Sequence, residues 1–229
     1  MNTNAAAARE SDATTGIAGL DDILAGGRKR NRVFLIEGSP GTGKTTAALS
    51  FLIAGAAAGE RVLYVTLSET EEELRDTARS HGWTLKGVEV FELVPPENLL
   101  DEHQQQSLLY SSDLELGETT RLILDAIEEA KPSRVVIDSL SEIRLLAQGS
   151  LRYRRQVLAL KHYFAQHGAT VVLLDDLTAE ISDKTVHSVA HGVIRLEELA
   201  PEYGAERRRI RVTKYRGRKF RGGYHDFAI

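Results

Sequence analysis

Apolar positions along the chain follow two different periods. Short apolar runs of strand length occupy 32–37, 61–66, 88–93, 134–138 and 170–175. Segments in which apolar residues recur with the helical period separate or follow them, at 45–58, 71–81, 118–131 and 152–167. Strands that alternate with helices are typical of βαβ units. We therefore expect an α/β fold with a mostly parallel sheet flanked by helices.

Local signals refine this picture at two places. Thr70 followed by Glu73 matches a capping box, so a helix should begin directly after the second strand, and the acidic run 71–73 fits the positive end of its dipole. Past residue 190 the pattern changes to strands at 192–197, 207–215 and 224–229. We expect these three to be antiparallel strands added at one edge of the sheet. The segment 94–117 has no interpretable pattern.

Length and composition are those of one ordinary globular domain. The 229 residues carry 27% charged side chains, a net charge of −4 and no cysteine, which excludes disulfides and thiolate metal sites. We expect a disordered leader over 1–12 and one domain over 13–229. No apolar stretch has the length of a membrane span and no signal peptide is evident, which favours a cytoplasmic protein. Nine basic residues gather between Arg207 and Arg221.

The first candidate site is a phosphate-binding loop. The segment 38–45 reads G-S-P-G-T-G-K-T and lies between a predicted strand and a predicted helix, as the G-x-x-x-x-G-K-[ST] motif requires. Its backbone N–H groups and the helix N-terminus would hold phosphates, Lys44 would reach the β and γ phosphates, and Thr45 would bind Mg²⁺. The nucleotide-binding residues predicted here are Gly38, Ser39, Pro40, Gly41, Thr42, Gly43, Lys44, Thr45 and Thr46.

A second strand provides a candidate metal-site carboxylate. The apolar run Val135-Val-Ile ends in Asp138, the pattern of a Walker B strand. Asp138 would hold Mg²⁺ through water, and Ser139 next to it would help to position that shell. ATP and Mg²⁺ are the expected cofactors. The guanine-reading motif N-K-x-D does not occur in the sequence.

Several segments together resemble KaiC-like ATPases of the RecA superfamily. Residues 15–27 read T-G-I-A-G-L-D-D-I-L-A-G-G, and V-T-L-S-E-T follows the second strand from Val65. The resemblance continues through Ile137-Asp-Ser139 and Lys214-Tyr-Arg-Gly217. It extends from about Thr15 to the C-terminus. KaiC has two such domains in tandem, whereas this chain has one, so the resemblance is to single-domain members.

The resemblance implies an assembly and a function. Such proteins form rings, usually hexamers, with ATP between subunits, and Lys214 and Arg216 match the Lys-x-Arg motif that reaches the γ-phosphate of the neighbour. Two cations at period two on a strand face the same side, as such fingers require. A regulatory or signalling homohexamer, similar to circadian clock proteins and read by an unidentified partner protein, is the function that the resemblance implies.

One departure bears on turnover. Where the family typically has two adjacent glutamates that activate water, this chain has Ser68 and Glu69. Only Glu69 can then serve as general base, and we expect slow ATP hydrolysis. Residues 28–31 also depart from the family, which usually has a shorter apolar-Pro-Gly link. Asp175 and Asp176 depart at the end of the fifth strand, where Asp176 would lie in a sensor region near the γ-phosphate.

Autokinase activity is one alternative. KaiC phosphorylates a Ser-Thr pair just before a late strand, and the matching positions here are His187 and Ser188, with Ser182 and Thr185 nearby. His187 and His191 also have the spacing of a helical metal pair, although no H-E-x-x-H motif is present.

Two other functions stay open at this point. One is a DNA-handling RecA- or RadA-like ATPase that uses the basic C-terminal strand. The weak net charge and the low aromatic content, 6%, argue against a nucleic-acid partner. The other is an ATP-gated scaffold that does not hydrolyse ATP, which Ser68 suggests because it stands where the family typically has a glutamate.

Overall fold

A single twisted sheet forms the centre of the protein. The computed structural model describes residues 12–93, 108–177, 185–200 and 202–229. The eight strands are ordered β10-β9-β8-β3-β7-β6-β4-β5. Their bounds are β3 Val33–Gly38, β4 Val62–Thr66, β5 Val88–Glu92, β6 Arg134–Asp138, β7 Thr170–Asp176, β8 Gly192–Leu199, β9 Arg207–Tyr215 and β10 His225–Phe227. The predicted α/β class and mostly parallel sheet are confirmed.

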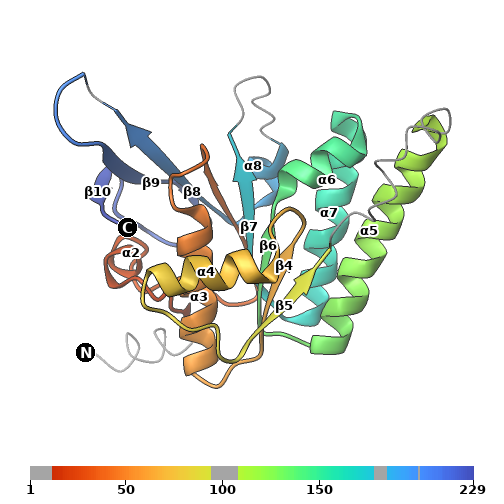
Figure 1. The fold of residues 1–229 in the computed structure, drawn as a ribbon, viewed down its shortest axis with the longest axis horizontal. Coiled ribbons are helices and arrows are strands. Elements are labelled where there is room, and N and C mark those ends of the chain that lie inside the picture. The colour runs from red at the N-terminus through yellow and green to blue at the C-terminus, as the bar shows by residue number, and fades with distance from the viewer. Residues whose placement is uncertain (1–11, 94–107, 178–184, 201) are drawn as a thin grey trace.

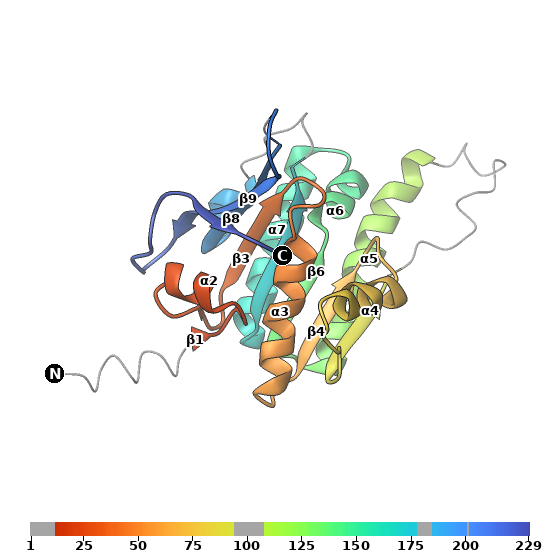
Figure 2. The same ribbon diagram turned by 60° about the vertical axis from the view of Figure 1, so that its left-hand side comes forward.

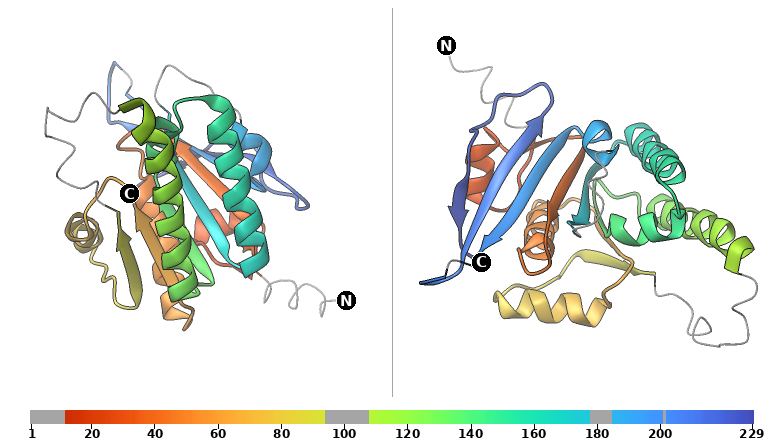
Figure 3. Two further views of the ribbon diagram at one scale, coloured as in Figure 1. Left: turned by 90° about the vertical axis from the view of Figure 1, so that its right-hand side faces the viewer. Right: turned by 90° about the horizontal axis from the view of Figure 1, so that it is seen from above.

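Helices cover both faces of this sheet (Figures 1 and 3). Those described are α2 Ala18–Ile23, α3 Lys44–Ala57, α4 Glu71–Ser80, α5 Leu108–Ala130, α6 Leu140–Ala147, α7 Ser150–His167 and α8 Thr185–Val189. The prediction for α5 was too short, because Gly117 suggested a boundary, whereas α5 continues through it. The short helices α2, α6 and α8 were not predicted.

The apolar alternation along β3 explains why there are two layers of helices. Phe34 and Ile36 belong to the core under α2, α3 and α4. Val33 and Leu35 belong to the core on the other face, under α5, α6 and α7. Successive side chains on a strand point to opposite faces, so a fully apolar strand requires cover on both sides. The view from above shows α3 and α4 on one face of the sheet and α5 and α7 on the other (Figure 3).

The capping box of α4 forms as predicted. The Thr70 hydroxyl accepts from the Glu73 backbone N–H at 3.3 Å, and the Glu73 carboxylate accepts from the Thr70 backbone N–H at 2.7 Å. These bonds satisfy donors that a helix start leaves free, and they hold the turn that carries Glu69 against the end of β4.

The C-terminal strands differ from the prediction in one respect. β9 and β10 are antiparallel to their neighbours, as expected. β8 was expected to be antiparallel as well, but it runs parallel to β3 with Phe34 opposite Gly192 and Gly38 opposite Leu196. The connection from β7 through α8 returns the chain to the other end of the sheet, which forces this direction. β3 is therefore an interior strand with parallel neighbours on both sides.

The N-terminal segment packs beside the sheet (Figure 2). β1 (Asp12–Ala13) pairs with β2 (Arg28–Lys29) in a separate small sheet. Asp12 was expected to end a disordered leader, but its carboxylate binds Arg218 at 2.5 Å. Residues 1–11, the rest of that predicted leader, lie outside the described part of the chain. None of the described helices combines the length and the apolar character needed to cross a membrane.

A buried ion pair connects the segment that follows α3 to the first residue of β6. Arg134, with 1% of its side chain exposed, binds Glu60 at 2.7 Å and donates to the Phe51 carbonyl at 2.9 Å. Arg30 binds the same carboxylate from the exposed side at 2.8 Å. Hydrogen bonds from Arg30 and then Arg134 hold the pKa of Glu60 well below its usual value, although burial opposes this.

This ion pair leads to a stability prediction. Glu60→Gln should lower the free energy of unfolding at pH 7 by about 3 kcal/mol, because removing one partner leaves a buried charge uncompensated. The depressed pKa of Glu60 means that its contribution is complete above the unfolded pKa, roughly 4.3, and is lost as the pH falls below it. Urea denaturation at pH 7 and at lower pH would measure this.

The matched control is Asp125→Asn, which removes a pair with Arg121 whose side chains are 57% and 62% exposed. It should change stability by less than about 1 kcal/mol. Equal effects of the two substitutions would contradict the structural role given to Glu60.

Candidate functional site

The loop between β3 and α3 forms the centre of the site. Its tip, Ser39 to Gly41, is exposed, whereas Gly38, Thr42 and Lys44 are buried. Gly41 and Gly43 have φ angles of 81° and 92°, which residues with a Cβ rarely adopt. The chain can therefore turn sharply into α3, whose first N–H groups lack intrahelical acceptors. A helix N-terminus of this kind is a site for anions, phosphates above all.

Two glycines of the loop are required by space as well. A Cβ on Gly38 would lie 2.6 Å from the Thr42 hydroxyl and 2.7 Å from the Leu196 carbonyl oxygen. A Cβ on Gly43 would lie 2.3 Å from the side chain of Ile229. The loop is thus packed between β8 and the C-terminal residues of the chain.

Lys44 points back over the loop. Its Nζ atom donates to the carbonyls of Gly38 at 2.9 Å and Ser39 at 3.0 Å, and it lies 2.8 Å from the Asp176 carboxylate. These three acceptors match the three hydrogens of an ammonium group. The sequence predicted the position of Lys44 but not that Asp176 would be its partner.

The two predicted magnesium ligands lie together. Asp138 ends β6, is 7% exposed, and accepts a hydrogen bond from the Tyr64 hydroxyl at 2.6 Å. Burial raises the pKa of Asp138, while the Tyr64 hydroxyl and, more weakly, the Thr45 hydroxyl oppose the rise. Tyr64 was not predicted; its position on β4 two residues before Thr66, which pairs with Asp138, is the signal that could have identified it. Ser139 is 3% exposed and directly precedes α6.

Glu69 faces the same space. Its backbone is held by Thr66, whose hydroxyl accepts from the Glu69 N–H at 2.9 Å and donates to the Glu69 carbonyl at 2.6 Å. Burial, followed by the charges of Asp138, Glu73 and Asp176, raises the pKa of Glu69, and Lys44 opposes the rise. One carboxylate oxygen is buried without a hydrogen-bond partner among the described residues. Ser68 beside it is exposed.

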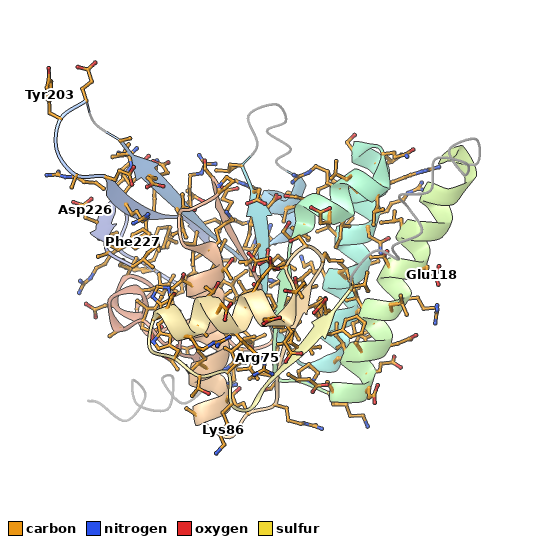
Figure 4. The ribbon with its side chains drawn as sticks, viewed as in Figure 1. Arg75, Lys86, Glu118, Tyr203, Asp226 and Phe227 are labelled. Carbon is orange, nitrogen blue, oxygen red and sulfur yellow. The ribbon has the colours of Figure 1, made fainter. Side chains whose placement is uncertain are left out.

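A cavity of about 480 Å³ adjoins the loop, and Asp138 is not among its lining residues. Gly43, Thr46 and Ala47 form its wall at the start of α3. Thr46 lies 3.5 Å from the His81 ring, and the centroid of that ring lies 4.9 Å from that of Trp83, with the two ring planes tilted by 33°. The C-terminal segment with Phe227 and Ile229 also lines the cavity. Asp226 and Phe227 lie on β10, the edge strand of the sheet (Figure 4). This cavity was not predicted, because its walls come from segments far apart in the sequence.

Lys214 and Arg216 lie elsewhere. Lys214 lies near the end of β9, and Arg216 directly follows that strand. Val193 pairs with Lys214, and Gly192 pairs with Phe34, so both cations lie near the amino end of β3 and away from Gly38 at its carboxyl end. Lys214 donates to the His187 carbonyl, and Arg216 donates to the Ser188 carbonyl at 2.7 Å. The structure therefore does not bring these two cations to the phosphate loop of their own chain.

His187 and His191 both make contacts within the fold. His187 Nε2 lies 2.6 Å from the buried carboxylate of Glu37, which also binds Arg195 at 2.7 Å. His191 lies beyond the end of α8 and accepts from the Val33 N–H at 3.1 Å, and burial lowers its pKa to about 4. Of Ser182, Thr185 and Ser188, only Ser188 has a side chain within the described residues, and it is exposed.

A phosphate loop lies between β3 and α3 with Lys44 and Thr45, and the carboxylate of Asp138 ends β6, a parallel strand that β7 separates from β3. This arrangement defines a P-loop nucleoside-triphosphate-binding protein of the RecA type. The family profile described as ATPase: KaiC matches residues 13–229. The chain belongs to the KaiC ATPase family.

Relatives agree with this assignment. A UPF0273 protein of Aeropyrum pernix is 30% identical over 223 residues, which cover 94% of this chain and 89% of the relative. A UPF0273 protein of Thermotoga maritima is 29% identical, with 94% and 91% covered. The circadian clock protein KaiC2 of Synechocystis is 30% identical over 230 residues, and the match covers 94% of this chain but 38% of KaiC2.

The packing of the loop generates a prediction. Gly38→Ala should weaken nucleotide binding by roughly tenfold or more. The added Cβ overlaps with the Leu196 carbonyl, at a cost of about 1–3 kcal/mol, so the loop must shift away from the geometry that binds phosphate. Titration with a fluorescent nucleotide measures the effect. Gly117→Ala is the matched control: its Cβ would meet nothing within 4 Å, and it should leave affinity unchanged. Unaltered affinity in Gly38→Ala would contradict the role given to this close approach.

Proposed function

We propose that the protein binds Mg-ATP on the loop 38–45 and hydrolyses it slowly, as a regulatory ring oligomer with nucleotide at subunit interfaces. The observation that carries the proposal is the convergence of Lys44, Thr45, Asp138 and Glu69 at the carboxyl ends of β3, β4 and β6. These residues come from three separate parts of the sequence, and each has the chemistry that one step of phosphoryl transfer to water requires.

The chemistry can be assigned residue by residue. Lys44 and the loop N–H groups hold the β and γ phosphates, and Thr45 with Asp138, through water, holds Mg²⁺. When bound, Mg²⁺ neutralises charge that develops on the transferred phosphoryl group. Glu69 orients the attacking water and accepts its proton. The raised pKa of Glu69 supports this role, since a base works best when its pKa approaches the working pH.

The base of the nucleotide fits the cavity beside α3. The α-phosphate must lie at the helix start, and Gly43 and Thr46 there also line the cavity. Its apolar walls, formed in part by Trp83, Phe227 and Ile229, suit a flat aromatic ring, and polar groups such as Asp226 lie at its edge. The adenine would therefore contact the C-terminal segment of the same chain.

The position of Lys214 and Arg216 supports action on a neighbouring subunit. They lie away from their own phosphate loop, so a role in catalysis requires a second copy of the chain. Among the described residues, their hydrogen bonds go to carbonyl oxygens of α8, which a γ-phosphate can outcompete. The circadian clock names of KaiC relatives support a regulatory use of the nucleotide state, read by a partner protein.

Glu69→Gln should slow phosphate release from Mg-ATP by on the order of a hundredfold or more, because the amide can orient water but cannot accept a proton. The affinity for the nucleotide should stay within about threefold of that of the unmodified protein. Turnover by the unmodified protein should rise as the pH increases through the raised pKa of Glu69. Glu72→Gln, an exposed glutamate in the first turn of α4, is the control. Equal turnover in Glu69→Gln and the unmodified protein would remove Glu69 from the mechanism.

Action of Lys214 and Arg216 in trans can be tested by mixing two inactive variants. A Lys214→Ala/Arg216→Ala protein keeps its phosphate loop, whereas Lys44→Ala keeps its basic pair. If the pair serves a neighbour, the mixture should release phosphate faster than the sum of the separate proteins. A purely additive rate, in mixtures that light scattering shows to be mixed oligomers, would place the pair outside catalysis.

A further inference from the structure

The carboxylate of Asp176 is the ion-pair partner of Lys44, the side chain to which we assigned the β and γ phosphates. Asp176 ends β7, and its Oδ1 atom lies 2.8 Å from Lys44 Nζ. The backbone of Asp176 is fixed: it pairs with Gly38 across the parallel register, and the Leu177 N–H donates to the Gly38 carbonyl at 3.2 Å. The side chain is 32% exposed, so it reaches into the open site from a rigid strand.

The neighbouring carboxylates make the site electronegative. The charge of Asp176 contributes to raising the pKa of both Asp138 and Glu69, which means that the three groups share one space. Lys44 is the cation that is close to all three: it binds Asp176 directly and opposes the shifts of the other two. A γ-phosphate that enters this space adds up to two negative charges beside Asp176.

We propose that Asp176 is a specificity residue that competes with the γ-phosphate for Lys44 and so favours ADP over ATP in this site. The inference rests on the proposed nucleotide-binding function. With ADP bound, Lys44 can donate to the β-phosphate and keep its ion pair with Asp176. ATP must either separate that pair or place its γ-phosphate next to an unpaired carboxylate. Either alternative makes the binding free energy of ATP less favourable, whereas ADP binding requires neither.

The neighbouring Asp175 shows why the two acids are not equivalent. Asp175 is 6% exposed, and its carboxylate binds Arg144 at 2.5 Å and accepts from Ser141 at 3.3 Å. Its charge is thus compensated on the far side of β7, away from the loop. The paired acids therefore divide into one that stabilises the sheet end and one that faces the nucleotide.

This competition also gives the slow turnover a second source. After hydrolysis and departure of phosphate, Asp176 can recover Lys44, which stabilises the ADP-bound state. Exchange of ADP for ATP then limits the cycle, independently of the carboxylate that is missing at Ser68. A conformational change that moves Asp176 away from Lys44 would raise the fraction of the protein that is bound to ATP rather than ADP.

The test compares affinities for Mg-ADP and for a Mg-bound, non-hydrolysable ATP analogue, by displacement of a fluorescent nucleotide. Asp176→Asn should raise the affinity for the ATP analogue relative to ADP on the order of tenfold, a unit-charge repulsion discounted for solvent screening. Asp176→Glu, which keeps the charge, should retain most of the preference of the unmodified protein. Asp125→Asn, an exposed acid on α5, should leave the ratio unchanged.

The outcomes separate the inference from the function on which it rests. An unchanged ratio in Asp176→Asn, or weaker binding of both nucleotides, would overturn the role of Asp176 while nucleotide binding itself stands. Failure of the unmodified protein to bind either nucleotide more tightly than Lys44→Ala would instead contradict the proposed function.

Discussion

The parallel register of β3 between β7 and β8 determines the geometry of the site. It places Gly38 opposite Asp176 on one side and Leu196 on the other. The Leu196 carbonyl leaves no space for a Cβ at Gly38, and Asp176 meets Lys44. The registers of β6 on β7 and of β4 on β6 then bring Asp138 and Glu69 to the same side of the site, at the carboxyl ends of the strands. Nucleotide chemistry in this protein therefore depends on the pairing of interior strands.

Most of the fold could be predicted because interior strands are apolar on both sides. β6 and β9 begin and end where the pattern placed them, and the loop motif lay where its mechanism requires. The misses have physical causes. A glycine inside α5 resembled a boundary, since glycine weakens helices, although tertiary packing overrides that preference. The direction of β8 depends on the connection through α8, which periodicity does not reveal.

Some features of the candidate site could be predicted from the sequence, and others could not. Lys44, Thr45 and Asp138 were predicted because motif spacing follows the local chain, and the structure brings them together. The contacts of Tyr64, Asp176 and Glu37 were not predicted, because each joins segments that are distant in sequence. Lys214 and Arg216 could be placed on a strand, but whether they serve their own loop or that of a neighbour required the sheet order. Their roles stay predictions.

Phosphate release from Mg-ATP, with the mass of the same sample followed by light scattering, tests the central claim most directly. The account predicts slow release that is confined to a ring-sized species and is absent from Lys44→Ala. Release by monomers at an undiminished rate would contradict a site completed by a neighbouring subunit. Release by Lys44→Ala at the rate of the unmodified protein would contradict the assignment of the phosphate loop itself.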